Sequence, residues 1–309
     1  MIKTVVICGP TASGKTDISV ALAKKFAFEI VCADSMQIYR ELQIATARPT
    51  VDEMCGIPHR LFASVSVEEE YSVADFCVDA KAEIDNILKG NSRPMLCGGT
   101  GLYIDSLING TDFTKSSSDK VVMEKLVAEY EHFGAEYMHK KLQKVDSESA
   151  EKIHANNVKR VLRALEIYEV SGQPKSVVDK LALENESDYE PLYIGITYND
   201  RQKLYDRIEK RVDLMIENGI LDEVRNFYKL NPCKTAEAAI GCKEFKPYLD
   251  GEMSLDDCIS NLKTATRRYA KRQLTWFNRN KKINWLHPDI LGKDGCIQAA
   301  SELIGNFYE

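Results

Sequence analysis

Long apolar runs are absent from this chain of 309 residues. No stretch approaches the roughly 18 to 20 continuous apolar residues that a membrane-spanning helix needs. The nine cysteines include no Cys-x-x-Cys pair, which argues against a zinc ribbon, and the five histidines stand at no metal-ligand spacing. Met1 leads directly into an apolar, strand-like segment, so we expect no signal peptide. Cysteines inside apolar segments fit a reducing compartment, and we expect a cytoplasmic protein without membrane contact.

An overall excess of positive charge is also absent, because the formal net charge is −6, and this average argues against a nucleic-acid partner. Two local clusters indicate the opposite. No Asp or Glu occurs between Cys258 and Pro288, whose eight cations are Lys263, Arg267, Arg268, Lys271, Arg272, Arg279, Lys281 and Lys282. A second acid-free cluster contains Lys152, Lys159, Arg160 and Arg163. Each cluster is either a surface for a phosphate backbone or a solvated helix face.

Residues 9–16 read GPTASGKT, which is the complete Gly-x-x-x-x-Gly-Lys-Ser/Thr phosphate-binding loop of ATP- and nucleotide-binding proteins. An apolar strand-like run precedes it and a helical pattern follows it, as the motif requires. Glycines let successive backbone N–H groups point at phosphate oxygens, and the helix adds its positive dipole end. A lysine supplies a point charge and a threonine can hold Mg²⁺. The loop residues are Gly9, Pro10, Thr11, Ala12, Ser13, Gly14, Lys15 and Thr16.

Strand-like and helical patterns alternate along the first hundred residues. The expected strands are 5–8, 29–33 and 94–97, and the expected helices between them are 15–26 and 73–88. Residues 119–172 read as nearly all helix, with breaks at Gly134 and near Asp146 and a stop at Gly172. A strand at 192–197 and helices at 199–219, 219–230 and 254–279 follow. The pattern predicts an α/β fold with a P-loop NTPase-like parallel sheet, built from residues 1–115 and 191–309. Residues 116–190 would form a mostly helical insertion domain. The stretches 116–118 and 183–191 would be its borders.

Asp34 follows the second strand, beside the phosphate-binding loop, because the carboxyl ends of parallel strands meet at one edge. Its carboxylate could hold Mg²⁺, act as a general base, or cap the next helix. Gln37 has an amide that can read adenine through two hydrogen bonds. After the third strand comes the turn GGTGLY (98–103), in which Thr100 offers a hydroxyl, although such turns are also purely structural.

The segment TRRYAKRQLTWF (266–277) interleaves cations with aromatic side chains on a predicted helix. Its cations can follow a phosphate backbone. Its aromatic residues, Tyr269, Trp276 and Phe277, can stack on bases or fill the core.

With these segments in view, the chain resembles the tRNA dimethylallyltransferases, also called tRNA isopentenyltransferases. Nine motifs occur in order over nearly the whole chain, which makes the resemblance specific. They are GPTASGKT (9–16), DSMQIYR (34–40), IATARPT (44–50), IPHRLF (57–62), GGTGLY (98–103), NVKRVLRALE (157–166), RIEKRVDLM (207–215), AIGCKEF (239–245) and TRRYAKRQLTWF (266–277). With no zinc finger before residue 309, the chain is similar to the compact bacterial type.

The resemblance implies transfer of the dimethylallyl group from dimethylallyl diphosphate to N6 of adenosine 37. The acceptor would be a tRNA that reads codons beginning with U, bound through its anticodon stem-loop. Asp34 would be the general base, and Thr100 would position the reacting centre. The phosphate-binding loop, Arg207 and Arg211 would hold the diphosphate, with Mg²⁺ on Thr16. Contacts to tRNA would come from Asp34, Ser35, Met36, Gln37, Asn157, Val158, Lys159, Arg160, Val161, Gly241, Cys242, Lys243, Arg267, Arg268, Lys271 and Arg272.

Some positions depart from the family pattern. Ala45, Arg48 and Arg60 are mild changes, whereas Cys242 replaces a usual Tyr and puts a stacking role there in doubt. The alternatives are an isopentenyltransferase that acts on free adenylate, a P-loop small-molecule kinase, and a P-loop module that binds RNA without catalysis. The helical insertion and the basic helix argue against the first, and Asp34 and Thr100 argue against the last. We expect a monomer.

Overall fold

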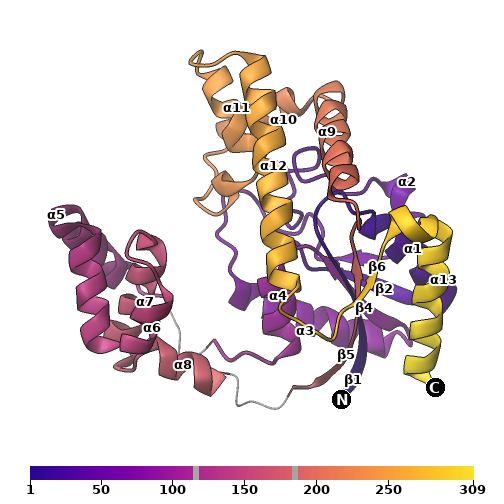
Figure 1. Ribbon diagram of the computed structural model, residues 1–309, viewed down its shortest axis with the longest axis horizontal. Coiled ribbons are helices and arrows are strands. Elements are labelled where there is room, and N and C mark those ends of the chain that lie inside the picture. The colour runs from indigo at the N-terminus through magenta and orange to yellow at the C-terminus, as the bar shows by residue number, and fades with distance from the viewer. Residues whose placement is uncertain (114–117, 183–186) are drawn as a thin grey trace. The chain divides into compact units, whose positions relative to one another are not determined.

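A six-stranded, all-parallel sheet forms the centre of the larger part of the chain in the computed structural model (Figure 1). Its strands are β1 (Ile2–Cys8), β2 (Phe28–Cys32), β3 (His59–Arg60), β4 (Arg93–Gly98), β5 (Tyr189–Ile196) and β6 (Asn284–Leu286), in the order β3-β2-β4-β1-β5-β6. Residues 5 to 8 of β1 are fully buried. Such a continuous apolar run is typical of a parallel strand that is covered on both faces.

Helices cover both faces of this sheet. The helix α1 (Lys15–Phe26) and the C-terminal helix α13 (Pro288–Tyr308) pack side by side on one face, and α3 (Val73–Lys89) and α4 (Gly101–Ile108) on the other (Figure 1). The core beneath α1 and α13 brings together Ile7, Ile194 and Ile304, all fully buried. The predicted α/β fold with a parallel sheet is therefore confirmed.

The remaining elements of the larger unit are helical. They are α2 (Val51–Met54), α9 (Arg201–Glu217), α10 (Ile220–Lys229), the short 3₁₀ helix η2 (Ala236–Ala238), α11 (Cys242–Leu249) and α12 (Leu255–Phe277). The helix α12 packs against α9, α11 and α4. Its C-terminal half therefore reaches the edge of the sheet where the strands end.

The structure describes residues 1–113, 118–182 and 187–309. The chain divides into one unit of residues 1–108 and 189–309 and a second unit of residues 109–188. The sequence placed the insertion at 116–190, a few residues from this division. Parts of its predicted borders, 116–117 and 183–186, lie outside the described residues.

The second unit is helical and has a core of its own. It contains α5 (Lys120–Val145), α6 (Ser147–Lys152), α7 (Val158–Ser171) and α8 (Lys175–Ala182). The predicted breaks are confirmed: Gly134 kinks α5 with φ of 80°, Asp146 separates α5 from α6, and Gly172 ends α7 with φ of 70°. Leu126, Met138 and Leu165 meet in the interior.

Several elements of the larger unit were not predicted from the sequence, among them β3, β6 and α13. The two strands are two and three residues long, too short for a periodic signal. The helix α13 bends at Gly292, where φ is 70°, and mixes apolar with small residues. Among the described residues, no helix is long and apolar enough to cross a membrane.

Candidate active site

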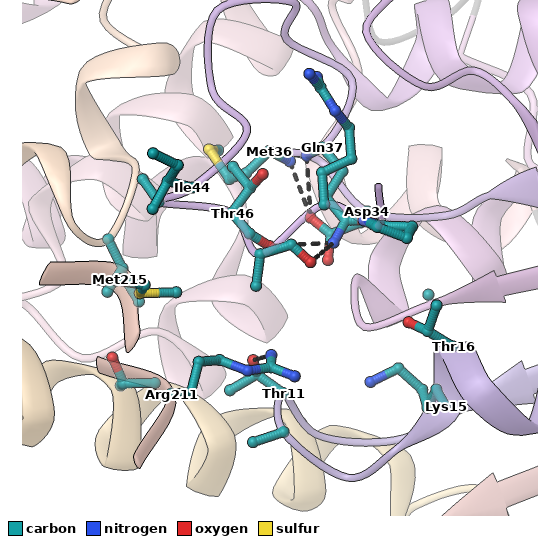
Figure 2. Close-up of a pocket in the computed structure, with 18 of the residues that line it drawn as sticks. Thr11, Lys15, Thr16, Asp34, Met36, Gln37, Ile44, Thr46, Arg211 and Met215 are labelled. Carbon is teal, nitrogen blue, oxygen red and sulfur yellow. Dashed lines mark hydrogen bonds between the residues drawn. The ribbon is translucent and has the colours of Figure 1, made fainter. Parts of the chain in front are cut away.

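A cavity of about 910 Å³ opens at the carboxyl ends of the strands in the larger unit. It is lined by the phosphate-binding loop from Thr11 onward, by Asp34 to Gln37, by the segment 43–50, and by side chains of α9 and α12. Figure 2 shows Lys15 and Arg211 pointing toward one another, and Asp34, Met36 and Gln37 around another part of the space. The segments that the sequence predicted to converge at this edge therefore do so.

Contacts with backbone carbonyl groups constrain the phosphate-binding loop. Lys15 Nζ donates a 2.7 Å hydrogen bond to the Pro10 carbonyl. Gly9 has φ of 141°, and a Cβ there would stand 2.2 Å from the Ile196 carbonyl oxygen, so the close approach to β5 requires glycine. Ser13 is buried, and its hydroxyl has no hydrogen-bond partner among the described residues. A buried hydroxyl without a partner is costly unless a ligand uses it.

Two arginines of α9 hydrogen-bond to this loop and line the cavity. Arg207 Nε donates to the Ala12 carbonyl at 2.9 Å, and Arg211 Nη1 donates to Thr11 Oγ1 at 3.1 Å. The structure thus brings both arginines to the phosphate-binding loop. Burial lowers the pKa of Arg211, and the neighbouring Arg207 acts in the same direction.

The pKa of Lys15 is lowered as well. Burial lowers its pKa from the ordinary value, the negative charge of Asp34 acts against this effect, and the positive charge of Arg211 acts with it. Two desolvated cations and several backbone N–H groups facing one space form a site for an anion. A bound diphosphate would favour the charged form of both side chains.

Asp34 is oriented by the turn that follows it. Its Oδ1 accepts hydrogen bonds from Met36 N at 3.0 Å and Gln37 N at 3.4 Å. The carboxylate therefore caps this turn and still lines the cavity, so it is positioned to accept a proton from a ligand.

Thr100 contacts the same turn through Ser35. Its Oγ1 accepts from Ser35 N at 3.0 Å and lies 3.3 Å from Ser35 Oγ. Ser35 lines the cavity, whereas Thr100 is not among the described residues that line it. Thr100 thus acts on the site through Ser35 in this structure. Gln37 Nε2 donates to the carbonyls of Thr46 and Ala47, at 3.1 and 3.4 Å, so its amide is partly engaged already.

Oxygen donors suitable for Mg²⁺ lie beside the loop. The hydroxyls of Ser13 and Thr16 and the carboxylate of Asp34 all line the cavity. Mg²⁺ is commonly held by one or two protein oxygens together with substrate phosphates and water. No group of three or more His, Cys, Asp or Glu that could hold a metal occurs in the described ranges. The residues present therefore fit an ion that is bound together with a diphosphate.

Similarity to known proteins agrees with this geometry. A family model described as IPP transferase matches residues 37–280. The chain is 45% identical over 291 residues to a tRNA dimethylallyltransferase of Thermoanaerobacter sp. (strain X514), covering 93% of this chain and 92% of the relative. The chain belongs to the IPP transferase family. A tRNA dimethylallyltransferase of Bacillus anthracis is 48% identical over 289 residues, 92% of this chain and 90% of that relative.

Two solved structures are similar to this protein over the full length of its chain. A tRNA isopentenylpyrophosphate transferase from Bacillus halodurans has a TM-score of 0.74 at 38% identity, covering 100% of this chain and 97% of the other. A eukaryotic dimethylallyltransferase described as acting on tRNA has a TM-score of 0.85 at 30% identity, covering 100% and 79%.

The basic helix α12 presents part of its charge to solvent. Arg268, Lys271 and Arg272 are exposed, and Arg272 also lines the cavity. Arg267 instead pairs with Glu209 at 2.5 Å, and Lys263 pairs with Asp213 at 2.6 Å. The stretch from Cys258 to Pro288 contains no acid of its own, but α9 supplies carboxylates that pair with two of its eight cations.

The aromatic side chains of α12 divide between core and cavity. Phe277 is buried, and Tyr269 lines the cavity. Trp276 Nε1 donates to Asp105 Oδ2 at 2.7 Å, and a Cβ at Gly101 would clash with its ring. Trp276 therefore joins α12 to α4.

Two of the predicted tRNA contacts need correction. Val161 is 1% exposed because its side chain fills the core of the helical unit, and Cys242 is 0% exposed at the start of α11. Neither side chain is available to an RNA surface. Burial of Cys242 also raises the pKa of its thiol. Just before Val161 in the sequence, Asn157, Lys159 and Arg160 are exposed, and Val158 is partly buried. Lys243 lines the cavity, and Gly241 precedes α11 with φ of 106°.

Gln273 is one residue of this site whose role was not predicted from the sequence. Its Oε1 accepts from Thr11 N at 2.8 Å, and its Nε2 donates to the Gly99 carbonyl at 2.9 Å. It is 5% exposed and faces the same side of α12 as the buried Ala270. A polar residue on the apolar side of an amphipathic helix was the available signal. Gln273 joins the phosphate-binding loop to the turn after β4.

Replacing Gln273 by Ala should weaken binding of Mg²⁺-diphosphate about 3- to 10-fold, because the Thr11 N–H loses the acceptor that orients it. Isothermal titration calorimetry measures this change. Gln298→Ala is the matched control, since Gln298 is exposed on α13. Equal affinities for the Gln273 variant and the control would contradict the assigned bridging role.

Proposed function

We propose that the protein transfers the dimethylallyl group from dimethylallyl diphosphate to N6 of adenosine 37 in tRNAs that read codons beginning with U, releasing diphosphate. The observation that carries the proposal is one cavity lined by the phosphate-binding loop from Thr11 to Thr16 and by an oriented carboxylate, Asp34. Membership of the IPP transferase family supports it, and so do relatives named tRNA dimethylallyltransferase. We infer a monomer that binds the anticodon stem-loop.

The diphosphate end of the reaction needs charge stabilisation. When the bond between C1 of the prenyl group and the diphosphate oxygen breaks, the electron pair leaves with the diphosphate. Backbone N–H groups of the loop, Lys15 and Arg211 stabilise that developing charge in a partly desolvated space. Thr16 would hold Mg²⁺ at this end of the cavity, and the ion would supply further neutralisation of the diphosphate charge. Ser13 Oγ, which has no partner among the described residues, donates to the same anion.

The acceptor end needs removal of one proton. The C1–N6 bond forms as the N6 amine of adenine gives its proton to Asp34. The carboxylate is held by Met36 N and Gln37 N, which leaves Oδ2 for the amine. Proton transfer to a positioned group contributes about 10²- to 10⁴-fold in rate. Thr100 keeps this turn in place through Ser35.

Other functions of a phosphate-binding loop are less consistent with the chain. A small-molecule kinase or a transferase for free adenylate has no need for an exposed row of cations beside the cavity, which Arg268, Lys271 and Arg272 supply here. A module that only binds RNA has no need for Asp34 within the cavity. The whole-length similarity to tRNA-modifying enzymes also argues against all three.

Incubation of the protein with unmodified tRNA, Mg²⁺ and dimethylallyl diphosphate should give N6-(dimethylallyl)adenosine on nucleoside mass analysis. Free AMP serves as the competing acceptor, and ATP as the competing phosphate ligand. Modification of AMP but not tRNA, or tighter binding of ATP than of dimethylallyl diphosphate, would overturn the proposal.

The variant Asp34→Asn should lower the rate of prenyl transfer about 10²- to 10⁴-fold, because the amide cannot accept the N6 proton. The hydrogen bonds from Met36 N and Gln37 N survive through the amide oxygen, so tRNA affinity should change little. Single-turnover kinetics and filter binding measure the two quantities. A near-normal rate would exclude Asp34 as the base.

Neutralising Arg268 and Lys271 as Gln should weaken tRNA binding and flatten its salt dependence, by about 0.7 to 0.9 in slope for each phosphate that the variant no longer neutralises. Both side chains are exposed, and Arg267 with its ion pair to Glu209 stays in place, so the fold should be unaffected. The double variant Lys24→Gln/Lys25→Gln, at exposed positions in the last turn of α1, is the control. An unchanged slope in the α12 variant would show that tRNA binds to another surface of the protein.

A further inference from the structure

One carboxylate holds three consecutive backbone amides at the wall of the cavity. Glu223 of α10 accepts hydrogen bonds at Oε2 from Gln43 N, 2.9 Å, and Ile44 N, 2.7 Å. Its Oε1 accepts from Ala45 N at 2.8 Å. The sequence separation is 180 residues for the first of these bonds, so they tie two distant segments together. Hydrogen bonds to an ionised acceptor are about twice as strong as neutral ones.

The tethered segment lines the cavity from Gln43 to Thr50, although it belongs to no helix or strand. Its conformation depends on side chains. Gln37 donates to the carbonyls of Thr46 and Ala47, and Arg48 donates to the Tyr39 carbonyl at 2.8 Å. These bonds stay within residues 37–48, whereas Glu223 tethers the beginning of the segment to a separate helix, α10.

The segment borders the part of the cavity that contains Asp34. Figure 2 shows Ile44 and Thr46 near Met36 and Gln37, while Lys15 and Thr16 lie in another part of the view. Gln37 connects the two directly, because its backbone N–H binds Asp34 Oδ1 and its amide binds the Thr46 carbonyl. Displacement of the segment therefore acts on the turn that orients Asp34.

We propose that Glu223 is a positioning residue for prenyl transfer, which fixes the segment 43–45 and thereby the acceptor side of the cavity. The proposal rests on the proposed function for its kinetic consequence. The diphosphate side has its own supports, namely Gln273, Arg207 and Arg211, and does not need this carboxylate. Loss of Glu223 thus affects the acceptor step more than the binding of the prenyl donor.

The variant Glu223→Gln tests the tether with little change in volume. One carboxylate oxygen becomes an NH₂ group, which cannot accept a hydrogen bond and faces a backbone donor. Asp222→Asn is the matched control, because Asp222 is the preceding, exposed acid and pairs with Arg225 on the same helix. Glu223→Asp keeps the charge but shortens the reach.

Amide hydrogen exchange gives a readout that does not depend on activity. Exchange of the amides of Gln43, Ile44 and Ala45 should accelerate about 10- to 100-fold in Glu223→Gln and remain unchanged in Asp222→Asn. Unchanged exchange in the Glu223 variant would overturn the proposal, whatever reaction the protein catalyses.

Kinetics then separates a positioning role from simple destabilisation. Glu223→Gln should lower kcat/KM for tRNA about 10- to 100-fold and leave the dissociation constant of dimethylallyl diphosphate within about threefold. Equal losses for donor and acceptor would indicate general damage to the fold and reject the positioning role. A wild-type protein that fails to prenylate tRNA would reject the proposed function alone, since the exchange result still stands or falls by itself.

Discussion

The hydrogen bonds of Gln273 join the phosphate-binding loop of the candidate site to the turn after β4. The phosphate-binding loop follows β1, the turn 98–103 follows β4, and the two strands are neighbours in the sheet, with Cys8 opposite Gly98. The Gln273 amide spans from Thr11 N to the Gly99 carbonyl. A Cβ at Gly99 would stand 2.2 Å from Gln273 Nε2, so glycine is required for this approach. Because Gln273 lies on α12, the helix that carries the exposed cations is also joined to the phosphate-binding loop.

Local signals in the sequence predicted most of the architecture. The glycine-rich loop, the strand at residues 5–8 and the breaks at Gly134 and Gly172 depend on neighbouring residues, and the structure has them. The helix α13 was missed because the bend at Gly292 interrupts its pattern, and its contacts are with α1, near the other end of the chain. Secondary structure that is defined by distant partners leaves a weak pattern in one sequence.

In the candidate site too, residues with a local sequence signal were predicted and residues defined by distant partners were not. The phosphate-binding loop and Asp34 were recognisable from residue type and from their place after a strand. Glu223 was not, since its partners are backbone amides about 180 residues away, which have no side-chain signature. The pairing of Arg267 with Glu209 was equally hidden, because charge along one helix does not tell which carboxylates a neighbouring helix presents. Burial of Val161 follows from the three-dimensional core of its unit.

Assembling this site costs free energy because two cations, Lys15 and Arg211, are buried in it. Lys15 and Arg211 both have lowered pKa values because they are buried, and the charge of Arg211 further disfavours that of Lys15. In the protein alone burial disfavours both charges, while Asp34, the Pro10 carbonyl and the Thr11 hydroxyl act against this effect. Negative charge that appears on a departing diphosphate relieves this repulsion most when the charge is greatest. Interactions that strengthen as the bond breaks lower the barrier, whereas equal stabilisation of bound substrate would not. The same motif that holds a nucleotide in other proteins can therefore serve a leaving group here.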